Sequence, residues 1–65
     1  MTPTEFRELR RKLGLTQTQL AAVMGYGVAG PSRISEIEGG KTVPAKAARL
    51  MEVYASGWRP DDWPD

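Results

Sequence analysis

The sequence contains no cysteine and no histidine, and its uninterrupted apolar runs are only a few residues long. Disulfide bonds and thiolate metal sites are therefore excluded, and the commonest general base and metal ligand are both missing. Apolar runs this short fit neither a membrane span nor a signal peptide. We therefore expect a cytoplasmic protein without a metal, without another cofactor and without a place in a membrane.

The 65 residues are enough for one small domain. A chain of this length buries only about 60% of the surface that its unfolded form exposes, so we expect no cleft between two lobes and no small-molecule ligand. With 40% apolar and 26% charged residues, the composition suits a folded chain rather than a disordered one. An enzyme is disfavoured, because histidine and cysteine are absent and the carboxylates fall on expected solvated helix faces or in the C-terminal segment.

The formal net charge of +1 hides an uneven distribution. Residues 1–49 carry eight basic and four acidic side chains, whereas residues 50–65 carry one basic and four acidic side chains. A basic body is a weak indication of nucleic-acid binding. We expect the acidic end of the chain to point away from a nucleic acid.

Start and stop signals predict helices at about residues 3–13, about eight residues after Thr16, about 31–38, and 44–55. The first two helices begin with capping boxes, Thr2 with Glu5 and Thr16 with Gln19. Pro31 is expected at the first position of the third helix, with Gly30 as its cap. Apolar residues recur at helical spacing and predict the core: Phe6, Leu9, Leu13, Leu20, Val23, Met24, Ile34, Ile37, Ala47, Leu50, Met51, Val53 and Tyr54.

Residues 58–65 contain two tryptophans and two prolines, and they have room for at most one short helical turn, which would be a fifth helix. We therefore predict an all-α fold, with a compact four-helix domain at residues 1–57 and a Trp/Pro-rich tail at residues 58–65. Trp58 and Trp63 either fold back onto the core or form a dimer surface with the fourth helix. Two short helices joined by a glycine-containing turn form a helix-turn-helix.

The residues also resemble a known family. The ordered set "LTQ..LA", from Leu15 to Ala21, and "IS.IE.GK", from Ile34 to Lys41, resembles the λ-repressor-like regulators of the XRE or Cro type. The resemblance covers about residues 5–55. One departure is the turn before Ile34, where eight residues replace the usual five. The longer turn either offers backbone amides or Tyr26 to a phosphate and alters the angle between the helices, or it is a tolerated surface insertion.

The resemblance implies that the third helix enters the DNA major groove. The matching base-reading positions are Ser32, Arg33, Glu36 and, at the edge, Ser35. Arg33 is suited to the O6 and N7 atoms of guanine, and Glu36 either accepts from cytosine N4 or holds Arg33 in place. The alternative interpretation of this face is an ordinary solvated surface with an Arg–Glu pair.

Positions for phosphate contacts are Gln17, Lys41, Thr42 and Lys46, and the alternative interpretation of each cation is an ordinary solubilising side chain. Lys46 is unfavourably placed in the first turn of a helix unless an anion lies near it. Arg10 and Glu38 match a pair that is often structural in the family, so we expect a partly buried salt bridge between them.

The leading hypothesis is therefore a sequence-specific, DNA-binding transcriptional regulator of bacterial or phage origin, most simply a repressor. We expect it to be cytoplasmic and associated with the nucleoid when it is bound to double-stranded DNA. A homodimer would read a palindromic, inverted-repeat operator with half-sites about one DNA turn apart. The other hypothesis is an antitoxin-like interaction module that binds a protein partner through the tail.

Overall fold

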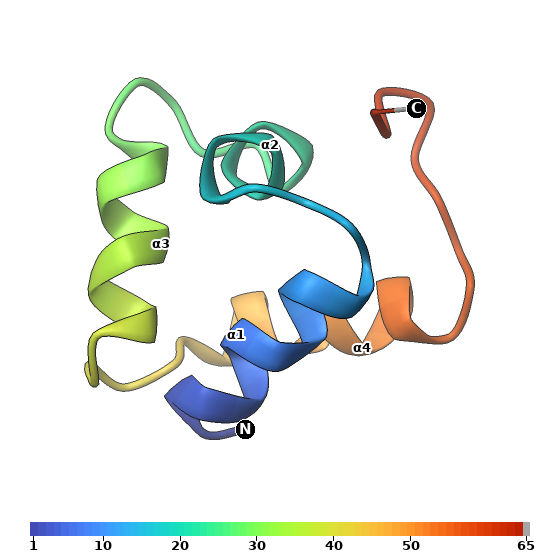
Figure 1. The fold of residues 1–65 in the computed structure, drawn as a ribbon. Coiled ribbons are helices and arrows are strands. Elements are labelled where there is room, and N and C mark those ends of the chain that lie inside the picture. Colours follow the sequence, from blue (N-terminus) through green and yellow to red (C-terminus); the bar gives the residue numbers. More distant parts are fainter. Residues whose placement is uncertain (65) are drawn as a thin grey trace.

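The computed structural model describes residues 1–64, which form four helices and no strand (Figure 1). The helices are α1 (Pro3–Lys12), α2 (Gln17–Val23), α3 (Gly30–Glu38) and α4 (Ala45–Ala55). The predicted all-α fold with four helices is confirmed, and the described part of the tail contains a turn rather than a fifth helix. Within the described chain, no helix has the length and apolar character needed to cross a membrane.

The first two helices begin with the predicted capping boxes. The Thr2 hydroxyl accepts from the Glu5 amide at 3.1 Å, and the Glu5 carboxylate accepts from the Thr2 amide at 2.9 Å. The bond from the Thr2 backbone is the main reason why the pKa of Glu5 lies below its ordinary value. Thr16 and Gln19 repeat the arrangement at the same two distances. These reciprocal bonds use amides that have no partner inside a helix, and so they fix where α1 and α2 begin.

The other two helix starts differ from the predictions by one residue. α3 begins at Gly30 with Ala29 as its cap, not at Pro31 with Gly30 as its cap. α4 begins at Ala45, because Pro44 has an extended backbone (ψ 142°) and serves as the cap. The prediction for α3 was wrong by one residue, because the Arg33 amide donates to the Ala29 carbonyl at 3.0 Å and so brings Gly30 into the helix.

One core joins the four helices. α2 packs against α3, and α1 packs against both α3 and α4. Its largest fully buried side chains come from every helix: Phe6, Leu20, Ile34, Met51 and Tyr54. Val53 does not belong to this core as predicted, since its position on α4 leaves it 41% exposed.

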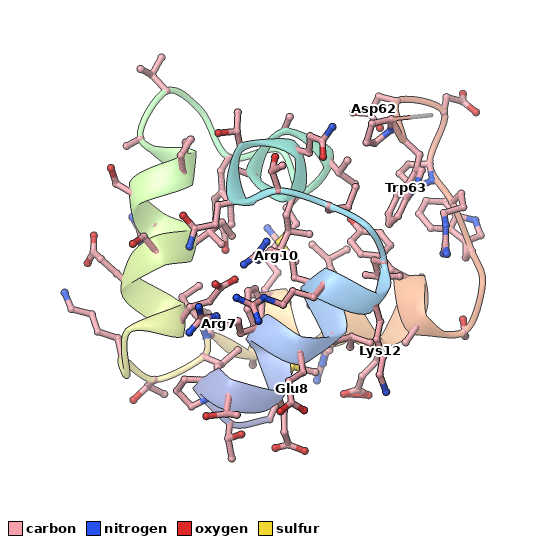
Figure 2. All side chains as sticks on the ribbon, in the orientation of Figure 1. Arg7, Glu8, Arg10, Lys12, Asp62 and Trp63 are labelled. Atoms are coloured by element: carbon pink, nitrogen blue, oxygen red, sulfur yellow. The ribbon has the colours of Figure 1, made fainter. Side chains whose placement is uncertain are left out.

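The tail folds back onto the C-terminal end of α4, and Trp63 points from the tail toward the body of the molecule (Figure 2). The Trp63 ring meets the Tyr54 ring edge-on, with centroids 5.2 Å apart. The Arg59 guanidinium lies 4.3 Å above the Trp63 ring and donates to the Tyr54 carbonyl at 2.6 Å. A cation at a helix C-terminus is also favoured by the helix dipole. Trp63 thus covers the core, while Trp58 stacks on Tyr54 and stays 55% exposed.

The end of the tail brings acidic charge to this side of the molecule. Burial, and to a smaller degree the negative charge of Asp62, raise the pKa of Tyr54. The tail and α3 lie on opposite sides of the view in Figure 1. Residue 65, the last of the predicted tail, lies outside the described residues.

Candidate nucleic-acid interface

α2, the turn after it and α3 form a closely packed helix-turn-helix. Ile34 and Ile37 are buried on the inner side of α3, where α3 meets α2. The approach is closest at Gly30, where an added Cβ would lie 2.7 Å from Ala21 and 2.8 Å from Tyr26. Because a larger residue does not fit at Gly30, this contact fixes the first turn of α3 against α2.

The outer side of α3 carries the residues predicted to read bases. Successive residues of an α-helix are about 100° apart around its axis. Ser32, Ser35 and Glu36 therefore lie opposite the buried isoleucines, and Arg33 lies on the flank of the same exposed surface. All four side chains are exposed. The structure thus presents one continuous polar surface with a guanidinium, a carboxylate and two hydroxyl groups.

Glu36 is paired with Lys41, not with Arg33. The Lys41 ammonium group donates to the Glu36 carboxylate at 2.7 Å, and the two side chains are 72% and 49% exposed. This hydrogen bond is the main reason why the pKa of Glu36 is below its ordinary value; the charges of Lys41 and, more weakly, Arg33 act in the same direction. A residue predicted to contact phosphate therefore lies directly beside one predicted to read bases.

Gln17 belongs to a second network, which connects three parts of the fold. Arg10 donates to both oxygens of the Glu38 carboxylate at 2.6 and 3.0 Å, and to the Leu15 carbonyl at 2.8 Å. The Gln17 side-chain amide donates to the same carboxylate at 3.2 Å. The labelled Arg10 reaches into the space between α1, α2 and α3 (Figure 2). The network therefore holds the Gln17 amide at the start of α2.

A family model described as a helix-turn-helix domain matches residues 4–59 of the chain, which include all four helices. The chain belongs to the helix-turn-helix domain family. Membership in this family indicates a DNA-binding regulator. No curated protein and no solved structure matches the chain.

The remaining two predicted contact residues lie after the second helix of the helix-turn-helix. Thr42 is exposed on the segment between α3 and α4, and Lys46 is exposed in the first turn of α4. Among residues 1–64, no side chain caps the amides at this end of α4, in contrast to α1 and α2. Free amides and a cation at one helix end both favour an anion.

Two features of this helix-turn-helix were missed in the sequence. The bond from Gln17 to Glu38 spans 21 residues and has no local signal. Val28, in the turn before α3, is 103% exposed. Its signal was present, because a β-branched apolar residue stands in a glycine-rich turn where polar residues are usual.

Proposed function

We propose that this chain is a sequence-specific, λ-repressor-like transcriptional regulator of the XRE or Cro type, most simply a repressor, that places α3 in the major groove of double-stranded DNA. The observation that carries the proposal is the division of α3 into two sides. Its inner side is anchored by Ile34 and Ile37, while its outer side carries Ser32, Arg33, Ser35 and Glu36. A rigidly held helix with a polar outer surface suits the width and the hydrogen-bonding groups of the major groove.

Each outer residue of α3 has a role that follows from its donors and acceptors. Arg33 offers the parallel donors that match the O6 and N7 acceptors of guanine. Glu36 accepts from a cytosine amino group, and the two serines reach bases or phosphates. Base contacts of this kind determine which sequence is bound.

Phosphate contacts from Gln17, Lys41, Thr42 and Lys46 flank this surface in the proposed complex. Lys41 exchanges its exposed bond with Glu36 for a DNA phosphate, and an exchange at an exposed pair costs little. Gln17 uses the amide hydrogen that does not face Glu38, so Arg10 and Glu38 support this contact without touching DNA. These contacts position α3 but carry no sequence information.

The regulator acts as a homodimer on an inverted-repeat operator in this proposal. A specific protein–DNA interface buries about 1,000–2,500 Å² of protein surface, whereas the chain exposes only 4291 Å² in total. Two copies reach that area without using most of either surface. Exposed apolar side chains at Val53 and Trp58, on and after α4, are the candidate dimer contacts. Occlusion of a promoter, controlled by the concentration of the regulator itself, is the simplest mode of action.

Selection of bound duplexes from a random pool tests the proposal. We expect a palindromic consensus with half-sites about one DNA turn apart, together with a dimer in sedimentation at the concentrations that bind. A pool that shows no enrichment after repeated rounds would contradict sequence-specific binding. An enriched site without two-fold symmetry would contradict the homodimer on an inverted repeat.

Arg33→Ala tests the base-reading role. We expect the affinity for the selected site to fall by about 1–3 kcal/mol, with relaxed preference at one base pair of each half-site. Arg11→Ala removes an exposed arginine from α1 and is the matched control, for which we expect an unchanged base preference. An equal loss for Arg33→Ala on all sequences would show that Arg33 contacts only the backbone.

A further inference from the structure

The turn between α2 and α3 is an ordered structure, not a loose insertion. The Gly30 amide donates to the Gly27 carbonyl at 2.8 Å, which closes a four-residue β-turn. Ala29 has φ −82° and ψ 4°, close to the values of the third residue in a type I turn. Tyr26 packs against the core and against Gly30, so the base of the turn is fixed. The turn therefore holds Val28 in a defined position at its tip.

Val28 is the most exposed large apolar side chain in the described part of the molecule, at 103%. Beside it lies a shallow hollow of about 230 Å³, which is lined mainly by Thr18, Ala22, Tyr26, Val28 and Pro31. None of the described residues that line this hollow carries a charge. The turn thus adds a small apolar surface to an otherwise polar helix-turn-helix.

This apolar surface adjoins the residues proposed to read bases. Pro31, which lines the hollow, is followed directly by Ser32 and lies on the same side of α3 as Ser35, four residues later. The edges of base pairs in the major groove carry hydrogen-bonding groups, and the 5-methyl group of thymine is the apolar exception. An apolar surface beside the reading helix therefore has one complementary group on the DNA.

We propose that Val28 and the hollow beside it recognise the 5-methyl group of a thymine in each half-site, next to the base pairs contacted by Ser32 and Ser35. This inference rests on the proposed function, because it requires α3 to enter the major groove. It makes Val28 a further specificity-determining residue, and it assigns a role to the three residues by which the turn is longer.

Replacement of single thymines by uracil in the selected duplex tests the inference, because uracil lacks only the methyl group. We expect one thymine in each half-site at which uracil weakens binding about fourfold, the value for one buried methyl group. With Val28→Ala the same replacement should change binding less than twofold. Val53→Ala, which shortens another exposed valine on α4, is the matched control and should retain the fourfold effect. The melting temperature of Val28→Ala should be unchanged, since the side chain is exposed.

The outcomes separate this inference from the proposed function. If Arg33→Ala alters the base preference but no thymine shows a uracil effect, or if Val28→Ala retains the full effect, the inference is overturned and the proposed function stands. If no duplex is enriched at all, both are overturned. A uracil effect that disappears only with Val28→Ala supports the inference.

Discussion

The two glutamates of α3 form ion pairs of opposite character, although they are only two residues apart. The side chain of Glu38 is 5% exposed and that of its partner Arg10 is 12% exposed. The side chain of Glu36 is 49% exposed and that of its partner Lys41 is 72% exposed. The two positions differ by about 200° around the helix axis, so one glutamate faces the fold and the other faces away from it. Position on the helix, rather than residue type, therefore decides the role of each carboxylate.

The surroundings of the two pairs explain the difference. Removing Arg10 and Glu38 from water is costly. The cost is offset by bonds from Arg10 to both oxygens of the Glu38 carboxylate and to the Leu15 carbonyl, and by the bond from Gln17 to the Glu38 carboxylate. Exposed pairs contribute little to stability because water and salt screen them. Glu38 thus holds α1, α2 and α3 together, whereas Glu36 leaves Lys41 available for exchange with another anion.

The largest expected difference between the two pairs is in the loss of stability when the glutamate of each pair is replaced. Glu38→Gln leaves the Arg10 charge without a counter-ion in a nearly buried site, and we expect the free energy of unfolding to fall by roughly 3 kcal/mol. Glu36→Gln, the matched variant on the exposed side, should cause no measurable change. Urea denaturation measures the free energy of unfolding of both variants. Equal losses would contradict the difference between the buried and the exposed pair.

A 65-residue domain has little stability to lose, so Glu38→Gln alone could leave no folded protein to measure. The double variant Arg10→Met with Glu38→Leu replaces the pair by apolar side chains of similar size, and such replacements are often neutral or stabilising. We expect it to be folded and more stable than Glu38→Gln. A double variant as unstable as the single one would show that the cost comes from the lost hydrogen bonds, including those of the Leu15 carbonyl and the Gln17 amide, rather than from the unpaired charge.

Features of the fold that depend on nearby residues could be predicted from the sequence. Local signals predicted the helices: Thr2 with Glu5 and Thr16 with Gln19 cap α1 and α2 as expected. The isoleucine spacing correctly predicted the inner side of α3. These features depend on residues three or four apart, which a sequence shows directly.

Features that depend on distant contacts could not be predicted in the same way. The close packing of Gly30 against Ala21 of another helix, which requires a glycine there, has no signal in the local sequence. The bond from Gln17 to Glu38 likewise depends on how α2 meets α3. Lys41, the partner of Glu36, is only five residues away, and this pairing depends on how the chain turns after α3. The covering of Tyr54 by Trp63 was one of two alternatives, since the sequence does not show where a tail folds.

A smaller effect is expected on DNA binding, and it concerns only the exposed pair of Glu36 and Lys41. Lys41→Ala should weaken binding to every DNA sequence by a similar factor, because a phosphate contact carries no base information. The slope of log affinity against log salt should become shallower by about 0.9, the value for one phosphate contact. Titrations at several salt concentrations measure the slope. Lys12→Ala on α1 is the control, and an unchanged slope for Lys41→Ala would exclude a phosphate contact.

The smallest effect is on the titration of Glu36 in the free protein. Lys41 lowers the pKa of Glu36 chiefly by its hydrogen bond, so Lys41→Ala should raise this pKa toward the ordinary value of a glutamate. A carboxyl group whose pKa is lowered in the folded state stabilises the fold above its unfolded pKa, and this contribution is lost as the pH falls through the folded pKa. At this exposed pair the contribution is too small to measure by denaturation, so the pKa itself is the quantity to follow. NMR titration of the Glu36 side chain measures the change, and Glu5, whose pKa is lowered by Thr2, serves as the internal control. If only the Glu36 pKa rises, the exposed pair is present in solution and is local; if neither pKa changes, Lys41 does not hold Glu36 and is free for an anion without any exchange.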